Sequence, residues 1–388
     1  MSDPAFRPPR RTLLGPGPSG VLPEALEALA LPALGHLDPD FLELAGRVRD
    51  LLRPLFGTEN ELTFAVSGTG TAGMECCLLN LLEPGDRAVV GVHGYFGRRM
   101  ADIAWRAGAE VFEVSSPWGE PLDAAAMAEV IAERRPKLVA FVHAETSTGV
   151  LQDPAPIARA AREAGALVVL DCVTSLGGLP LAIDEWGIDA AYAASQKCLG
   201  APSGLAPVTF GPRALEAYFE RKTAPRSFYL DLGPLRHYWD PPHGYHHTAS
   251  SHLFYALHAA LQAVHAEGIA ARAARLERLH RGLVAGLEAL GLEIPVAREH
   301  RLPMLTPVLV PEGIDERDVR AELLSRHGIE IGGGLGNLAG RAWRIGLMGA
   351  SACERAVVEL LDALDGALAA RLGRPRRGAA DAARARLG

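Results

Sequence analysis

The stretch that decides the predicted fold is residues 166–200, ALVVLDCVTSLGGLPLAIDEWGIDAAYAASQKCLG. Its first apolar run ends on Asp171, and its second, residues 190–194, is followed at once by Ser195-Gln196-Lys197. Short apolar runs bounded by glycines are typical of fully buried parallel strands. Residues just past the carboxyl ends of such strands line the ligand crevice of an open α/β sheet. We therefore expect Asp171 and Lys197 to face one crevice.

An acid and a lysine in one crevice suit the chemistry of pyridoxal 5'-phosphate (PLP). This cofactor needs a lysine to form a Schiff base with its aldehyde, and an acid to keep its pyridinium nitrogen protonated. An ordinary salt bridge between two strand ends explains the same pair equally well. The remaining motifs have to decide between the two interpretations.

Length and composition limit the possible classes of protein. A chain of 388 residues with 48% hydrophobic residues is long enough for a large and a small domain. The formal net charge of −7 is spread along the sequence, which argues against nucleic acid as a partner. No apolar stretch has the length of a membrane span, and residues 1–11 lack the apolar core of a secretory signal.

The cysteines and histidines do not predict a metal site. The five cysteines are odd in number and lack metal-ligand spacing, which fits reduced thiols in a cytoplasmic protein. Several histidines gather in and just after the irregular stretch 238–251, but two of them are adjacent and no thiol lies nearby. We expect no metal.

A second motif predicts an anion site. An apolar strand, 62–66, is followed by Ser67-Gly-Thr-Gly-Thr-Ala-Gly73 and then by an apolar helical run, 74–82. Glycines let the backbone approach a ligand, and the unpaired N–H groups of a first helical turn bind phosphate. The motif is neither a Walker loop nor a dinucleotide fingerprint, so a phosphate monoester is the natural ligand. A tight turn with a Ser or Thr cap is the structural alternative.

Strands and helices alternate through the first two thirds of the chain. Polar residues follow the strands at 88–92 and 138–142. Phe96, shortly after the first of these strands, could stack on a planar ring or simply join the core. Such repeated β–α units predict a doubly wound, mainly parallel sheet. The pattern at 305–372 predicts a small α+β domain.

One arginine stands out in the small domain. Arg344 lies within the apolar strand AWRIG at 342–346, and a buried arginine needs an anionic partner. That partner is either a substrate carboxylate or the carboxylate of an internal ion pair.

We expect an N-terminal arm at 1–18, a large PLP-binding domain at 19–267 and a small domain at 268–388 with a frayed tail from about 373.

Together these motifs resemble those of the class V aminotransferases, PLP enzymes of fold type I, and in particular the alanine–glyoxylate and serine–glyoxylate (serine–pyruvate) group. The resemblance extends from Leu14 to Gly346. The motifs that carry it occur in the family's order: Leu14-Gly-Pro-Gly-Pro-Ser19, Ser67-Gly-Thr-Gly-Thr71, Glu145-Thr-Ser-Thr-Gly-Val150, Asp171-Cys-Val173, Ser195-Gln-Lys197, Tyr245-His-His-Thr248, Gly333-Gly-Leu-Gly336 and Arg344-Ile-Gly346.

The resemblance implies a role for each matching residue. Lys197 would form the Schiff base and move the substrate proton, and Asp171 would pair with the ring nitrogen. Further cofactor contacts are implied for Thr69, Gly70, Thr71, Phe96, Thr146, Val173 and Gln196, and across a homodimer interface for Tyr245 and Thr248. Substrate contacts are implied for Arg344, Gly15, Gly17 and His36.

The resemblance also implies the reaction. The chain would move the amino group of alanine or serine to glyoxylate, or to pyruvate, in a ping-pong cycle. Animal alanine–glyoxylate enzymes carry a histidine at the position of Thr71 and a tryptophan at that of Phe96, so the donor stays open; a small pocket with one arginine favours a short donor. A PLP lyase or desulfurase and a non-catalytic protein on the same fold are the alternatives.

Overall fold

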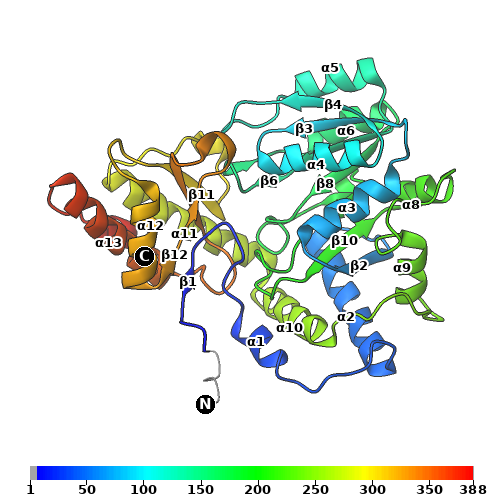
Figure 1. The fold of residues 1–388 in the computed structure, drawn as a ribbon, viewed down its shortest axis with the longest axis horizontal. Coiled ribbons are helices and arrows are strands. Elements are labelled where there is room, and N and C mark those ends of the chain that lie inside the picture. The colour runs from blue at the N-terminus through cyan, green and yellow to red at the C-terminus, as the bar shows by residue number, and fades with distance from the viewer. Residues whose placement is uncertain (1–6, 388) are drawn as a thin grey trace, which may run out of the picture.

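A computed structural model describes residues 7–387; residues 1–6 of the expected arm and residue 388 of the expected tail lie outside the described part. The ribbon forms two lobes, and the larger is built on a sheet (Figure 1). The sheet has seven strands in the order β2-β10-β9-β8-β5-β3-β4. Their bounds are β2 Leu62–Ser67, β3 Arg87–Val92, β4 Glu110–Ser115, β5 Leu138–Val142, β8 Leu167–Asp171, β9 Ala190–Tyr192 and β10 Leu205–Phe210.

All neighbouring strands of this sheet are parallel except at β10, which is antiparallel to both β2 and β9. Six of the strands are buried along almost their whole length, as continuous apolar runs require, whereas the edge strand β4 is partly exposed. The prediction of a doubly wound, mainly parallel α/β fold is confirmed.

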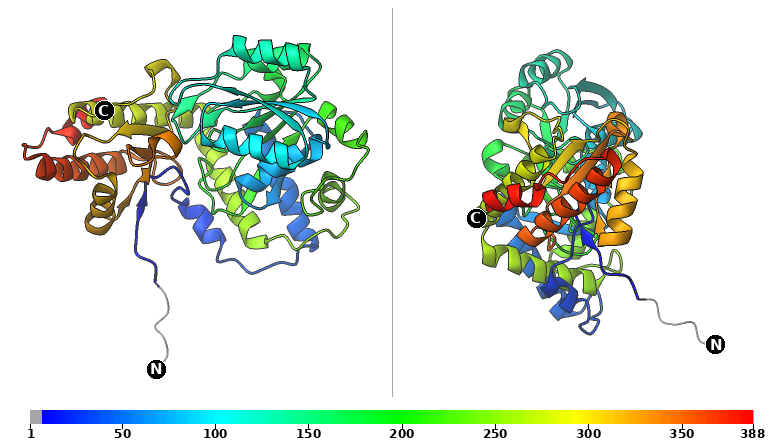
Figure 2. Two further views of the ribbon diagram at one scale, coloured as in Figure 1. Left: turned by 45° about the horizontal axis from the view of Figure 1, so that its top comes forward. Right: turned by 90° about the vertical axis from the view of Figure 1, so that its left-hand side faces the viewer.

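Helices cover both faces of the sheet. The helices α3 (Gly70–Leu81) and α4 (Tyr95–Arg106) pack together on one face, and α5 (Ala124–Arg134) and α6 (Ala155–Glu163) pack together on the other. The views in Figures 1 and 2 agree with this arrangement. The other elements of this lobe are α1 Pro23–Ala28, α2 Pro39–Phe56, β6 Ala144–Glu145, β7 Val150–Leu151, α7 Ile183–Trp186, α8 Pro212–Phe219, α9 Leu232–Trp239 and α10 Ser251–Glu267.

The smaller lobe is an α+β unit around an antiparallel sheet of order β11-β14-β13. The elements of this lobe are α11 Ile269–Ala289, η1 Arg298–His300, β11 Leu305–Leu309, α12 Glu316–His327, β12 Ile329–Glu330, β13 Gly332–Gly333, η2 Gly336–Leu338, β14 Ala342–Gly346, α13 Glu354–Leu372 and α14 Ala379–Leu387. The arm contributes the short strand β1 (Thr12–Leu13), which pairs with β12.

The buried apolar side chains form two separate clusters. One contains the large sheet and reaches as far as α10, and the other contains α11 and the elements after it. Leu14 of the arm belongs to the second cluster. We propose that Gly268, between α10 and α11, separates the two domains.

Among residues 7–387, no helix is both long and apolar enough to cross a membrane.

The expectation of a frayed tail from about residue 373 is wrong. Residues 379–387 form α14, which packs against α11 and α13. Ala379 and Ala383 are completely buried, and added Cβ atoms at Gly282 or Gly286 of α11 would clash with α14. Small residues on both helices therefore permit a close approach, which composition alone does not reveal. The position of this last helix beside α13 is visible in the right-hand view of Figure 2.

The start of α14 depends on one buried carboxylate, which gives a test. Asp365 accepts hydrogen bonds from the backbone N–H groups of Arg377 and Gly378, each at 2.9 Å to Oδ2. We expect Asp365→Ala to lower the free energy of unfolding by about 1–3 kcal/mol, because these donors lose their partner. Asp362→Ala, on the same helix but 62% exposed, is the control and should change it by less than about 0.5 kcal/mol. Equal shifts in melting temperature for the two variants would contradict this role.

Candidate active site

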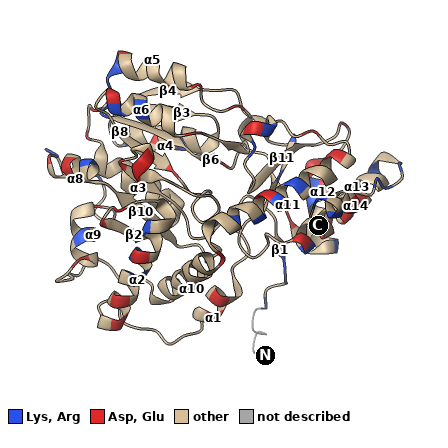
Figure 3. Cartoon of the chain, turned by 180° about the vertical axis from the view of Figure 1, so that it is seen from behind, with Lys and Arg blue, Asp and Glu red and all other residues tan. Residues whose placement is uncertain are grey.

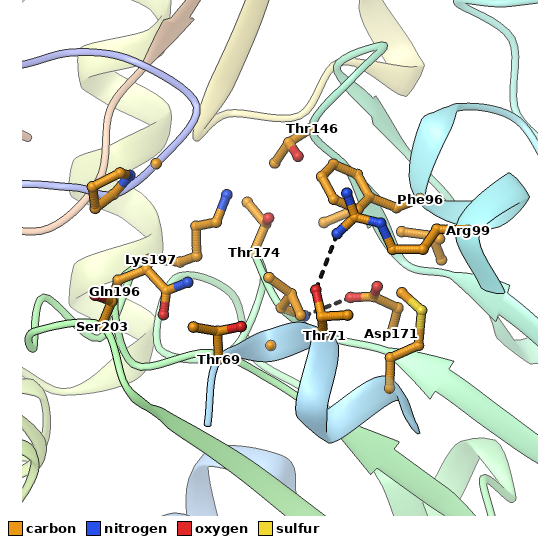
Figure 4. A pocket seen from close by; sticks show the side chains of 17 residues that line it. Thr69, Thr71, Phe96, Arg99, Thr146, Asp171, Thr174, Gln196, Lys197 and Ser203 are labelled. Atoms are coloured by element: carbon orange, nitrogen blue, oxygen red, sulfur yellow. Dashed lines mark hydrogen bonds between the residues drawn. The ribbon is translucent and has the colours of Figure 1, made fainter. Parts of the chain in front are cut away.

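A cavity of about 270 Å³ lies at the carboxyl ends of the central strands, beside the N-terminus of α3 (Figure 4). It brings together ten of the residues that the sequence analysis selected. These are Gly17, Thr69, Gly70, Thr71, Phe96, Thr146, Asp171, Val173, Gln196 and Lys197. Five selected residues do not line it: Gly15, His36, Tyr245, Thr248 and Arg344.

Lys197 reaches the cavity from the turn that follows β9. Its backbone carbonyl accepts a hydrogen bond from Ser19 Oγ at 2.8 Å, and its Nζ donates to the Pro16 carbonyl. The side chain is 8% exposed, and burial, followed by the nearby charge of Arg344, lowers the pKa of the amine to about 8. Gly17 adopts φ +115°, and a Cβ there would come within 2.7 Å of Nζ, so only glycine fits beside the amine.

Asp171 faces the same cavity from the last position of β8. Its Oδ1 accepts from the Val173 N–H at 2.8 Å and its Oδ2 from the Tyr192 hydroxyl at 2.7 Å. Burial raises the pKa of this carboxyl to about 7. Tyr192 was missed from the sequence, although it lies directly opposite Asp171 in the pairing of β8 with β9. The pairing of the two strands would have pointed to it.

The turn before α3 has the form of an anion site. Thr69 is the N-cap residue but makes no capping hydrogen bond, so its hydroxyl is available in the cavity. The N–H groups of a first helical turn have no intrahelical partner, and the helix dipole favours a negative ligand there. A Cβ on Gly70 would press to 3.0 Å from Val173 and 3.1 Å from Ala194, so glycine permits the close packing of this turn.

Two further polar groups line the cavity near this turn (Figure 4). Gln196 has a buried Oε1 without a hydrogen-bond partner, and its amide can present either end to a ligand. Arg99, which the sequence analysis did not select, donates from Nη1 to Thr71 Oγ1 at 3.1 Å. Its spacing of three from Phe96 on α4 places both on one helix face. The arginine that lines this cavity is therefore Arg99, and not Arg344, the one that was expected.

A buried carboxylate orients the aromatic wall of the cavity. Glu145 Oε2 accepts from the N–H of Phe96 at 3.1 Å and of Gly97 at 3.4 Å, in the first turn of α4. Its Oε1 accepts from Ser147 Oγ at 2.7 Å, and that hydroxyl accepts from the Tyr95 N–H at 2.8 Å. Burial raises the pKa of Glu145. This contact fixes where α4 begins and therefore where the Phe96 ring lies.

Arg344 lies just outside the cavity lining. Its Nε donates to the Gly333 carbonyl at 2.7 Å and its Nη1 to the Thr146 carbonyl at 3.2 Å. It is 7% exposed, burial lowers its pKa to about 10, and it forms no salt bridge with any carboxylate in residues 7–387. The internal ion pair that the sequence left open is therefore not what holds this guanidinium.

Tyr245 and Thr248 lie on the surface, away from the cavity of their own chain. The Tyr245 side chain is 67% exposed and its ring lies 5.4 Å from that of His36. Between them, His247 Nε2 is 2.7 Å from Ser67 Oγ, directly before the turn that leads into α3. The segment is thus anchored to the turn but presents its aromatic side chain outward.

The residues present fit PLP. The cavity offers a buried amine for the aldehyde, a carboxylate for the ring nitrogen, and an open helix N-terminus for the phosphate. Val173 and Phe96 supply apolar side chains for the ring. None of the described residues forms a cluster of metal ligands in this or any other place.

Comparison with known proteins identifies the relatives of the chain. The family model for aminotransferase class-V matches residues 25–341. A relative from Drosophila melanogaster, an alanine–glyoxylate aminotransferase, is 39% identical over 359 residues, covering 91% of this chain and 90% of the relative. The crystal structure of an alanine–glyoxylate aminotransferase from Nostoc sp. is 45% identical with a TM-score of 0.93, covering 95% of this chain and 98% of that one. The ureidoglycine–glyoxylate aminotransferase of Bacillus subtilis is 36% identical with a TM-score of 0.96, covering 98% and 99%.

The raised pKa of Asp171 predicts a pH dependence of the cofactor-free protein. A carboxyl with a folded pKa of about 7 and an unfolded value of about 3.9 favours the folded state below pH 4. That contribution is lost as the pH rises through 7. We expect Asp171→Asn to remove it, so that the melting temperature of the variant falls less than that of the wild type between pH 4 and pH 7. Parallel curves for the two proteins would contradict the shift.

Proposed function

This chain belongs to the class-V aminotransferase family, and we propose that it moves the amino group of a small amino acid, alanine or serine, to glyoxylate, with pyruvate as a second acceptor. Family membership makes it a transaminase with PLP as its cofactor. Glyoxylate stands in the names of the Drosophila, Nostoc and Bacillus relatives, which supports it as the acceptor. Alanine appears in two of those names, and the small cavity suits a short donor.

One observation carries the proposal: the amine of Lys197 and the carboxylate of Asp171 line one buried cavity beside the N-terminus of α3. Bound PLP supplies an electron sink for the bond that breaks at the substrate Cα. Asp171 would hold the ring nitrogen, with its second oxygen fixed by Tyr192. Thr69, Gly70, Thr71 and Gln196 would bind the phosphate, and Val173, Phe96 and Thr146 would contact the ring.

Lys197 is the proposed acid–base group. Burial lowers its pKa to about 8, so a fraction of the amine is neutral near pH 7 and can accept the proton from Cα. The same nitrogen can return the proton to the cofactor side, because one flexible side chain reaches both positions. Release of one keto acid before the second enters requires ping-pong kinetics.

Arg344 is the proposed binding group for the substrate carboxylate. Its guanidinium is buried, lacks a carboxylate partner within the described residues, and is close enough to Lys197 to lower the pKa of that amine. The planar guanidinium group can donate two parallel hydrogen bonds to the two oxygens of a carboxylate. Gly15, Gly17 and His36 would lie beside the substrate; of these, Gly17 lines the cavity beside Lys197.

A homodimer is the proposed assembly, with Tyr245 and Thr248 reaching the phosphate of the partner subunit. Support comes from an exposed aromatic surface around Tyr245: Phe228 is 75% and Tyr229 44% exposed, and both contact the histidines that follow Tyr245. A patch of large exposed aromatic side chains marks an interaction surface.

The lyase or desulfurase alternative is not favoured. A desulfurase needs a reachable thiol at the cofactor, and four of the five cysteines are buried. Burial raises the pKa of Cys198 to about 12, which keeps that thiol protonated. The fifth, Cys353, is the N-cap residue of α13 and does not line the cavity.

The assignment of Lys197 is tested by substitution. We expect Lys197→Ala to lower kcat for alanine–glyoxylate transamination by about 1,000-fold or more, because the acid–base group is lost. Borohydride treatment followed by peptide mass spectrometry should attach a pyridoxyl group to Lys197 in the wild type and to no peptide in the variant. Lys222→Ala, a surface lysine, is the control. Undiminished turnover in Lys197→Ala would refute the assignment.

The role of Arg344 is tested separately. We expect Arg344→Ala to raise the KM for the amino acid by about 100-fold, because a buried charge-assisted pair is lost. Arg344→Lys should recover part of this loss, since it keeps the charge but not the two-pronged geometry. Steady-state kinetics with alanine and serine measure both, and an unchanged KM in Arg344→Ala would show that the carboxylate binds elsewhere.

A further inference from the structure

The smaller lobe contains a second cavity, of about 310 Å³. It shares no lining residue with the cavity that contains Lys197 and Asp171. One wall is a single face of α11, and the opposite side comes from η1 and the residue after it, with α14 at the end. The arginines that line it are Arg281, Arg298, Arg301 and Arg386. Helix α14, which composition did not predict, is thus part of a formed cavity.

Arg281, the cavity arginine that lies on α11, differs from the other arginines of that helix. Arg272 and Arg275 of α11 both pair with Glu267, and Arg278 pairs with Glu354. Arg281, one turn further along, forms no salt bridge with any carboxylate in the described chain, and neither does Arg298. The chain therefore pairs arginines on one face of α11 and leaves those of the cavity without an anion.

Arg301 is partly held in place. Its Nε donates to the Val296 carbonyl at 2.9 Å, which orients the guanidinium and leaves its terminal nitrogens without a described carboxylate. Glu277 and Glu288 also line the cavity, yet no side-chain nitrogen of these arginines lies within salt-bridge distance of either carboxylate in the described chain. The lining carries more positive than negative charge in a protein whose formal net charge is −7.

A buried histidine provides an independent sign of a ligand. His280 lines the cavity and is only 5% exposed, but its Nδ1 has no hydrogen-bond partner. Buried polar groups without a partner are rare in folded proteins, because each costs free energy. Burial, followed by the charges of Arg301 and Arg281, lowers the pKa of the ring to about 4, so it is neutral at pH 7 and can donate or accept.

We propose that this cavity is a binding site for a small anion that carries two or more phosphate or carboxylate groups, held by Arg281, Arg298 and Arg301 with His280 at its floor. Guanidinium groups bind both kinds of oxyanion through paired donors. The volume is that of a small-molecule site, which excludes a macromolecular ligand inside it. In Figure 3, basic positions are coloured along α11 and near α14.

The test uses the PLP-loaded enzyme, so that a phosphate-containing probe cannot enter the cofactor site. Isothermal titration with inorganic pyrophosphate and with citrate, at 150 mM salt, measures the affinity of each probe. We expect at least one to bind the wild type with a dissociation constant below about 1 mM. Pyrophosphate alone would identify a phosphate site, citrate alone a carboxylate site, and both a general polyanion site.

The variants separate this cavity from non-specific attraction. Arg281→Gln/Arg298→Gln should weaken binding by about tenfold or more, because two charge-assisted pairs are lost. The double variant Arg317→Gln/Arg355→Gln removes the same charge from exposed positions elsewhere and should bind as the wild type does. His280→Phe keeps the ring volume and should weaken binding about threefold to tenfold. Failure of both probes to bind the wild type, or equal affinities in the two double variants, would overturn the proposal.

Discussion

The structure depends on the burial of an amine and a carboxylate in one crevice. Water stabilises both charged forms, so removal from water lowers the pKa of Lys197 to about 8 and raises that of Asp171 to about 7. The pKa values of the two groups therefore lie close to each other and close to neutral pH. An amine whose pKa lies near neutral pH can accept and return a proton at little cost, which is the condition for acid–base chemistry near pH 7.

Such burial persists only because neighbouring backbone and side-chain groups supply the missing hydrogen bonds. The Val173 N–H and the Tyr192 hydroxyl each donate to one oxygen of Asp171, and the Pro16 carbonyl accepts from Lys197. Both strand ends must therefore lie side by side, with the arm folded over them. The parallel pairing of β8 with β9 places Tyr192 opposite Asp171. A shift in the register of these two strands would therefore also separate the hydroxyl from the carboxylate.

The sequence predicted what local patterns encode. Apolar runs that end on Asp171 and before Lys197 were enough to bring these residues to one edge of the sheet, because the carboxyl ends of parallel strands meet there. Tyr192 and Glu145 were not selected, since their roles depend on which strand and which helix lie beside them. Helix α14 was missed for a related reason: its alanines resemble those of a disordered tail until α14 is known to pack against α11 at Gly282 and Gly286.

The arm explains how the two lobes and the site hold one another in place. Leu14 donates its N–H to Glu330 and accepts from the Gly346 N–H, both in the smaller lobe. Five residues later, Ser19 donates its N–H to the Gln196 carbonyl and its hydroxyl to the Lys197 carbonyl, in the larger lobe. The chain between them contains Pro16, whose carbonyl contacts the amine, and Gly17, which has no room for a side chain beside it. A shift of one lobe against the other must therefore move the arm, and the arm cannot move without displacing the lysine.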